Sequence, residues 1–314
     1  MGDTEGDQAR ADRPKVAVIG LGSMGSGIAA SLRRAGFAVS GHDVVAANAE
    51  RFAAEGGTAA ASPREAAEGC AIVASVVVNA AQTEAILFGE TGVAAAMPEG
   101  AVFISCATMS PDSARDLAAR LTAAGRHYLD APISGGAARA AEGRLTIMAS
   151  GSEAAFAAAR PALDAMAETI YELGPEPGTG AGFKMVNQLL AGVHIAAACE
   201  AIAFAASLGL DLRRVHEVIT KSAGNSWMFE NRIPHVLDAD YTPKSAVNIF
   251  TKDLGIVLDM ARATPLPAPM AGSALQLFLM TAAAGMGRDD DASVARLYAQ
   301  IAGLDLPTPP ETAG

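Results

Sequence analysis

Short runs of β-branched residues alternate with alanine-rich stretches of helical periodicity from Lys15 to about Gly174. Such alternation is typical of βαβ units, so it predicts an α/β fold with a mainly parallel, doubly wound sheet. The candidate strands are Val16–Ile19, Ala38–His42, Ile72–Val78, Val102–Cys106, His127–Asp130, Leu145–Ala149 and Thr169–Leu173. Ligands bind such sheets beyond the carboxyl ends of the strands, which is where a site is expected.

A segment rich in proline and glycine, Gly174–Gly178, marks a change of pattern, and β-type runs vanish beyond it. We therefore expect an α/β domain at residues 14–176 and an all-α domain at residues 177–314. The polar residues 1–13 lack the apolar core of a signal peptide and are expected to form a disordered tail. Helical stretches are predicted at about residues 182–208, 212–222, 245–263, 271–284 and 292–302.

Three glycines directly after the first predicted strand fit the spacing G-x-G-x-x-G. Gly20 permits the tight turn, Gly22 lets the backbone approach a pyrophosphate, and Gly25 lets the following helix pack closely. A purely structural turn is the alternative, but the place between strand and helix favours a phosphate site at the helix N-terminus. The expected dinucleotide-binding residues are Gly20, Leu21, Gly22, Ser23, Met24 and Gly25.

An acidic residue follows the second predicted strand, 18 positions past Gly25. A carboxylate at Asp43 suits the adenosine ribose hydroxyls and would repel a 2′-phosphate. No basic residue follows before Arg51, so the sequence predicts NAD rather than NADP. The alternative is that Asp43 is a solvated turn residue.

Composition excludes several classes of partner. The net charge of −11 argues against nucleic acid and against an anionic membrane surface. The three cysteines show neither metal-ligand spacing nor a disulfide pattern, so we expect buried thiols in the cytoplasm. The five histidines share no metal-binding spacing, and no metal site is expected. The apolar stretch Leu189–Leu210 approaches membrane length, but its polar interruptions favour a buried core helix.

A lysine and an asparagine lie three residues apart in the first apolar stretch after the boundary. Residues at this spacing share one face of a helix, so Lys184 and Asn187 are expected to act together. An amine in an apolar helix is costly to bury unless it is paired or loses its proton. Such a group suits proton transfer with a hydroxyl while hydride leaves the same carbon, which predicts a dehydrogenase. The alternative is a surface lysine whose stem lies along the helix.

Two further segments carry candidate polar chemistry. Ser134-Gly135-Gly136 follows a strand, and its backbone suits a substrate carboxylate, although a merely permissive turn fits equally well. Lys252 and Asp253 open a late helix, where a solvated capping pair is the plain alternative.

Four segments resemble, in order, the signature regions of the 3-hydroxyacid (β-hydroxyacid) dehydrogenase family: Gly20–Gly25, Asp130–Gly136, Gly178–Gln188 and Lys252–Asp259. Three more are most similar to its L-threonate dehydrogenase branch: Val78–Glu84, Ala107–Pro111 and Ser222–Arg232. The resemblance implies a Rossmann-type NAD domain followed by an all-α domain. It also implies a homodimer or homotetramer built on the long helix.

The resemblance assigns roles residue by residue. It implies that Lys184 is the catalytic general acid/base, that Asn187 orients the substrate, and that Ser134, Gly135 and Gly136 hold the substrate carboxylate. Asn225, in a polar segment of the branch, is expected to bind distal hydroxyls. The remaining implied cofactor contacts are Val77, Val78, Gln82, Thr108 and Lys252. The first two are the least direct, because relatives often carry a proline in that stretch.

The expected activity is NAD-dependent oxidation of L-threonate, or a close four-carbon sugar acid, to the 2-oxo acid. The alternatives are a 3-hydroxyisobutyrate dehydrogenase, a tartronate-semialdehyde (2-hydroxy-3-oxopropionate) reductase, and a non-catalytic dinucleotide-binding protein. The intact pair of Lys184 and Asn187 argues against the last of these.

Overall fold

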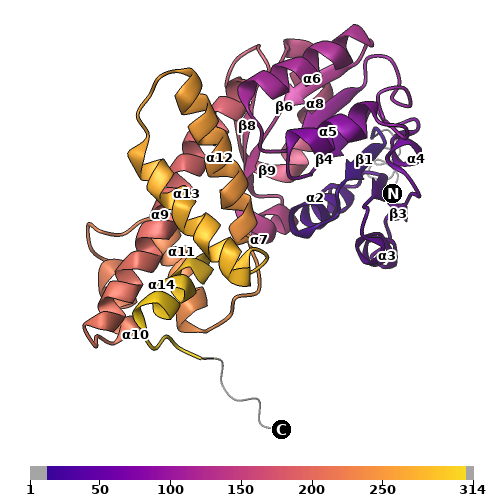
Figure 1. Ribbon diagram of the computed structural model, residues 1–314. Helices are drawn as coiled ribbons and strands as arrows, with labels where there is room; N and C mark the ends of the chain where they lie inside the picture. The colour runs from indigo at the N-terminus through magenta and orange to yellow at the C-terminus, as the bar shows by residue number, and fades with distance from the viewer. Residues whose placement is uncertain (1–12, 309–314) are drawn as a thin grey trace. The chain divides into compact units, whose positions relative to one another are not determined.

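The computed structural model describes residues 13–308, so nearly all of the predicted tail lies outside the described residues. The chain divides into two compact units, the first ending at Lys184 and the second beginning at Met185 (Figure 1). The domain boundary predicted after residue 176 stays a prediction.

A six-stranded parallel sheet forms the centre of the first unit. Its strands, in spatial order, are β3 (Thr58–Ala59), β2 (Val39–His42), β1 (Val16–Ile19), β4 (Ile72–Ser75), β5 (Val102–Ser105) and β6 (His127–Asp130). The strand order reverses between β1 and β4, which creates the crevice where doubly wound sheets bind ligands. The expected α/β fold is therefore confirmed.

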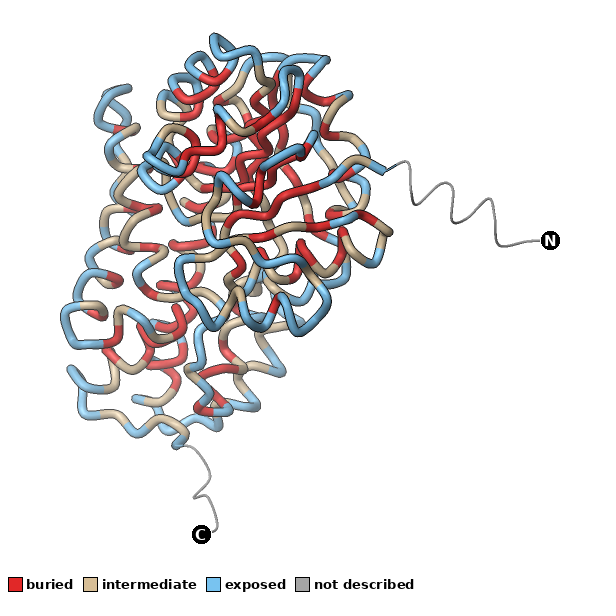
Figure 2. Tube along the Cα trace, turned by 90° about the vertical axis from the view of Figure 1, so that its right-hand side faces the viewer, coloured by how far each residue is buried: buried red, intermediate tan, exposed pale blue. Residues whose placement is uncertain are grey.

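Helices cover both faces of this sheet. One face packs against α2 (Ser23–Arg34), α7 (Gly136–Glu142) and α8 (Glu153–Met166). The other packs against α4 (Pro63–Ala67), α5 (Ala80–Phe88) and α6 (Pro111–Ala123). The short α3 (Ala46–Ala54) follows β2 and buries only Phe52. The central strands β1, β4 and β5 are buried throughout, because both of their faces are covered. Figure 2 shows buried residues in the interior of the trace and exposed ones along its outside.

The last predicted strands do not extend the parallel sheet. They form a separate sheet of β7 (Ile133–Ser134), β8 (Leu145–Ala149) and β9 (Ala167–Glu172), in which β7 and β8 are antiparallel. The sequence predicted the runs that form β8 and β9 but not the short β7. Pro132 lies between β6 and β7, where the chain leaves the first sheet for the second. The two-residue strands β3 and β7 are too short to give a periodic signal.

The second unit is helical in its described part. Its helices are α9 (Thr179–Ser207), which begins in the first unit, α10 (Leu212–Ile219), α11 (Trp227–Leu237), α12 (Val247–Ala263), α13 (Pro269–Thr281) and α14 (Val294–Ala302). A π-helical turn at Ala282–Met286 ends α13, where Gly285 has a φ of 90°. The helix α11 was absent from the predicted set. Ser226 caps its start, where the hydroxyl accepts from Phe229 N at 3.0 Å.

The long helix α9 is apolar enough to cross a membrane by length and composition, with a mean hydropathy of 1.9 in its most apolar window. Half of that window is buried inside the structure. Core helices of globular proteins show the same combination, and the polar residues within α9 fit that reading.

Candidate functional site

The glycine loop after β1 has a backbone that only glycine allows. Gly20 has a φ of +93°, and a Cβ there would lie 2.6 Å from the carbonyl oxygen of Val76. A Cβ on Gly25 would lie 1.8 Å from the carbonyl oxygen of Gly20, so α2 starts in close contact with the loop. A Cβ on Gly22 would meet nothing within 4 Å, and Gly22 caps α2 without a side-chain hydrogen bond. The open backbone and the helix N-terminus fit the pyrophosphate of a dinucleotide.

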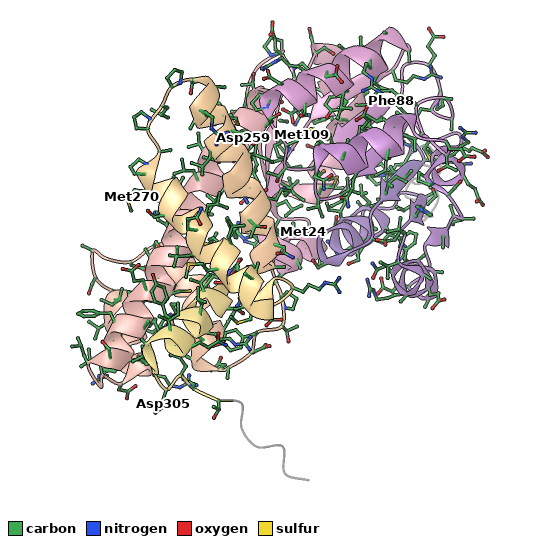
Figure 3. All side chains as sticks on the ribbon, viewed as in Figure 1. Met24, Phe88, Met109, Asp259, Met270 and Asp305 are labelled. Atoms are coloured by element: carbon green, nitrogen blue, oxygen red, sulfur yellow. The ribbon has the colours of Figure 1, made fainter. Side chains whose placement is uncertain are left out.

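The other loop residues divide into core and surface. The Leu21 side chain is buried, Met24 packs partly against the core from the first turn of α2 (Figure 3), and Ser23 is exposed. Leu21 therefore serves the site through its backbone, because its side chain belongs to the core.

Asp43 lies at the end of β2 and holds the glycine loop. Its Oδ2 accepts from Leu21 N at 2.7 Å, and its Oδ1 accepts from Val45 N at 2.7 Å. Each carboxylate oxygen has a second lone pair, so the group still has acceptor capacity for ribose hydroxyls. Arg51 donates to the carbonyl of Leu21 at 3.2 Å and to Asn48 Oδ1 at 3.1 Å. The nearest basic residue along the chain thus lies against the loop.

The remaining cofactor candidates of the first unit follow β4, which pairs with β1, and β5, which pairs with β4. Val77 and Thr108 are half-buried, and Val78 is exposed. Gln82 accepts from Val78 N at 2.8 Å, while Gln82 N donates to Asn79 Oδ1 at 2.9 Å. These two bonds form a cap at the start of α5, so the side chain of Gln82 has a structural role. The carboxyl ends of adjacent parallel strands share one edge, which brings these residues to the edge that carries Gly20.

Lys184 lies in the second turn of α9, where it is buried at 7% exposure. Its Nζ donates to the carbonyl oxygen of Ile133 at 2.8 Å. Ile133 directly precedes Ser134, Gly135 and Gly136, so the lysine reaches the segment expected to hold the substrate carboxylate. The two glycines have φ values of +134° and +79°, a backbone shape that side chains rarely adopt.

Asp130 anchors the start of α9, a role that the sequence analysis missed. Its fully buried Oδ2 accepts from Gly178 N at 2.9 Å, from Ala181 N at 2.8 Å and from Ser150 Oγ at 3.2 Å. Burial raises the pKa of this carboxyl to about 6, although the three hydrogen bonds oppose the shift. A glycine-rich helix start needs acceptors for its first N–H groups, and that need was the available signal.

In the second unit, two hydrogen bonds connect Asn187 with Asp253, which forms an ion pair with Lys252. Asn187 Nδ2 donates to Gln188 Oε1 at 2.9 Å, and Gln188 Nε2 donates to Asp253 Oδ2. The other oxygen of Asp253 forms an ion pair with Lys252. The sequence did not point to Gln188, and the solvated capping pair that it offered for Lys252 and Asp253 does not fit, because Asp253 is fully buried.

Asn225 lies between α10 and α11, and its amide ties that loop together. Its Nδ2 donates to the carbonyl of Thr220 at 3.3 Å and to Glu230 Oε2 at 3.4 Å. Its Oδ1 is buried without a hydrogen-bond partner. A substrate role for Asn225 stays a prediction.

No cluster of three or more histidine, cysteine, aspartate or glutamate side chains suited to a metal ion occurs within residues 13–308. Cys70, Cys106 and Cys199 are free and buried. Burial raises the pKa of the Cys106 thiol to about 12, which makes it a poor nucleophile.

Comparisons with known proteins agree with this geometry. Residues 15–174 match the family of the NAD-binding domain of 6-phosphogluconate dehydrogenase. Residues 178–298 match the NAD-binding family of NADP-dependent 3-hydroxyisobutyrate dehydrogenase. An L-threonate dehydrogenase of Cupriavidus necator is 51% identical, covering 93% of this chain and 97% of its own. One of Escherichia coli is 46% identical, covering 93% and 96%.

Solved structures give the same result. The crystal structure of a 3-hydroxyisobutyrate dehydrogenase from Salmonella typhimurium has a TM-score of 0.87 and 49% identity, and covers 91% of this chain and all of its own. The corresponding enzyme of Mycobacterium tuberculosis, solved with L-serine, has a TM-score of 0.79 and 30% identity, covering 90% and 98%. This chain therefore belongs to the 3-hydroxyacid dehydrogenase family and is an NAD-dependent oxidoreductase that acts on CH–OH groups.

Proposed function

We propose that this enzyme oxidises L-threonate, or a close four-carbon sugar acid, at the hydroxyl next to the carboxylate. The observation that carries the proposal is that five L-threonate dehydrogenases, from different bacterial strains, are 46–51% identical over 93% of this chain. NAD, when bound, supplies the oxidant that takes a hydride equivalent from the substrate carbon. The open backbone at Gly22 and the uncapped start of α2 support binding of its pyrophosphate there.

In this proposal Lys184 removes the proton from the reacting hydroxyl. An amine and an ammonium both donate hydrogen bonds, so the contact from Nζ to the Ile133 carbonyl persists in both protonation states. That bond orients the lone pair of the neutral amine. Lys184 is only 7% exposed, so little bulk water competes for its amine.

The other candidate residues position the two reactants. The backbone at Ser134, Gly135 and Gly136 would hold the substrate carboxylate, Asn187 a hydroxyl, and Asn225 the distal hydroxyls. The proposed cofactor contacts are Gly20, Leu21, Gly22, Ser23, Met24, Gly25, Asp43, Val77, Val78, Gln82, Thr108 and Lys252.

The test is NADH formation across a panel of C3–C6 hydroxyacids, measured with NAD and with NADP. We expect the highest kcat/KM with L-threonate and NAD. A second candidate, oxidation of 3-hydroxyisobutyrate, is supported by the name of the Salmonella structure. A higher kcat/KM with 3-hydroxyisobutyrate, or in the direction of tartronate-semialdehyde reduction, would replace the threonate proposal. NAD binding without turnover of any hydroxyacid would favour a non-catalytic role.

We also propose a homo-oligomer assembled in the cytoplasm. One face of α9 carries apolar side chains that are 49–64% exposed: Phe183, Val186, Leu190 and Phe204. Their spacing places them within one stripe of the helix, and exposed apolar stripes mark interaction surfaces. A second copy of the chain is the proposed occupant, as a homodimer or homotetramer. Three reduced, buried cysteines support the cytoplasmic compartment.

A further inference from the structure

A buried carboxylate lies two hydrogen bonds away from Asn187. Asp253 is fully buried on α12 and touches two polar groups of the second unit. One oxygen accepts from Gln188 Nε2, and the other forms the ion pair with Lys252. Gln188 in turn accepts from Asn187 Nδ2 at 2.9 Å. The four side chains therefore form one continuous series of polar contacts.

The chemistry of the groups determines the direction of every bond in this series. An ionised carboxylate only accepts hydrogen bonds, so Gln188 must turn its NH₂ group toward Asp253. The Gln188 oxygen is then left facing Asn187, which must present its own NH₂ group there. Because a carboxamide is planar, the Asn187 Oδ1 points away from Gln188. Asn187 is half-buried, and among residues 13–308 no hydrogen bond is made to its Oδ1.

We propose that Asp253 is a positioning residue that fixes the amide of Asn187 so that its carbonyl oxygen meets the substrate and accepts from a substrate hydroxyl. This inference rests on the proposed function, in which Asn187 contacts the substrate. It adds a selection rule: the group bound by Asn187 is a hydrogen-bond donor, so the substrate carboxylate is bound elsewhere. A hydroxyl-rich acid satisfies this rule.

Substitution of Asp253 by asparagine reverses the donor and acceptor roles along this series of side chains, without removing a hydrogen bond. The Lys252 ammonium only donates, so it selects the oxygen of the new side chain and leaves the NH₂ group facing Gln188. Gln188 must then turn over and donate to Asn187. The Asn187 oxygen then accepts from Gln188, so Asn187 presents its NH₂ group to the substrate instead.

A second substitution restores the acceptor. An aspartate at position 187 accepts from the reversed Gln188 with one oxygen and presents the other to the substrate. In the presence of Asp253 the same aspartate faces the Gln188 oxygen, so two acceptors oppose each other. The double variant D253N/N187D is therefore expected to lose much less activity than the sum of the losses in the two single variants.

The experiment measures kcat and KM for L-threonate over a pH range in D253N, N187D and the double variant. We expect each single variant to lose at least about tenfold in kcat/KM, and the double variant to recover at least about fivefold relative to either. The pH-independent plateau of kcat/KM is compared between variants, because a changed pKa of Lys184 would shift the pH profile, whereas a changed amide orientation would lower its plateau. The matched control is D259N on the same helix, where Asp259 (Figure 3) is exposed and pairs with Arg262; it should behave as wild type. The proposal would be overturned if the losses of kcat/KM in the two single variants added up in the double variant. It would also be overturned if D253N had the same kcat/KM as D259N.

A neutron structure of the deuterated protein tests the same point without turnover, because deuterium distinguishes the amide nitrogen from the oxygen. Wild type should show deuterium on the Asn187 atom that faces Gln188, and D253N should show it on the opposing Gln188 atom. Deuterium on the Gln188 atom that faces Asn187 in wild type would overturn the proposal. Absence of threonate oxidation by wild type, with the expected amide orientation present, would count against the proposed function alone.

Discussion

At the scale of single residues, Lys184 carries the proposed proton transfer. We expect Lys184→Ala to lower kcat by about a hundredfold or more, the usual scale of lost general acid–base catalysis. NAD affinity should stay near the wild-type value, because the glycine loop and Asp43 are unchanged. Steady-state NADH formation and a binding titration measure the two quantities.

The control for this substitution is Lys221→Ala, which removes an exposed lysine of the second unit. It should leave kcat unchanged. Near-normal turnover by a folded Lys184→Ala protein, with a melting temperature close to that of wild type, would contradict the assignment.

Asp43 is the second residue whose role can be measured directly. Asp43→Ala removes the acceptor for the ribose and two bonds to the loop, from Leu21 N and Val45 N. We expect NAD binding to weaken by about 1–3 kcal/mol, the scale of a lost charge-assisted hydrogen bond. The preference for NAD over NADP should shrink, because repulsion of a 2′-phosphate disappears.

Asp43→Asn separates the two roles of this carboxylate. It keeps an acceptor for Leu21 N but removes the charge, so it should narrow the cofactor preference with a smaller loss of NAD affinity. Measured Kd values of NAD and NADP for wild type, Asp43→Ala and Asp43→Asn distinguish the two roles. A wild-type enzyme that turns over faster with NADP would refute the assignment.

At the scale of elements, Asp130 couples the start of α9 to pH. Its pKa rises on folding from the ordinary 3.8 to about 6, chiefly through burial. Between these values the folded state keeps a proton that the unfolded state has released. The contribution of Asp130 to the free energy of unfolding therefore falls as pH rises from about 4 to about 6, by roughly 1.4 kcal/mol for each unit of pKa difference.

Asp130→Asn is expected to remove this part of the pH dependence. Urea unfolding at pH 4, 5 and 7 should give a flatter profile for the variant than for wild type. Asp112→Asn, at an exposed carboxylate in the first turn of α6, is the control and should keep the wild-type slope. An identical slope in Asp130→Asn would show that burial does not raise the pKa of this carboxyl as the structure indicates.

At the scale of the whole molecule, the exposed stripe of α9 is expected to hold the oligomer together. Phe204→Lys places a charge in a stripe residue that is 64% exposed, and burying it against a second copy would leave that charge unpaired. We expect the population to shift to a smaller species in sedimentation velocity. Val218→Lys, on α10 outside the stripe, should sediment as wild type. A monomeric wild-type protein would contradict the proposed assembly.

The local pattern of the chain was sufficient for the elements that give a periodic signal. The strands Val16–Ile19, His127–Asp130 and Leu145–Ala149 begin and end where the apolar runs predict. Burial on both faces requires a continuous run at Val16–Ile19, whereas Leu145–Ala149 alternates buried and half-buried residues. The predicted strand at Ile72 ends three residues early, at Ser75, because the chain turns there toward the glycine loop. The glycine spacing predicted the loop after Val16–Ile19, because the backbone of that loop leaves no room for a side chain at Gly20 and Gly25.

Only the tertiary structure revealed the contacts that join distant segments. Asp130 meets Gly178 across 48 positions, and Gln188 meets Asp253 across 65. Neither aspartate differs from its neighbours in any local pattern, because the need for an acceptor arises only once the fold buries a donor beside it. The separation of β8 and β9 into a second sheet has the same origin. Strand pairing depends on which edges meet in space, whereas the hydrophobic period of a strand is the same in either sheet.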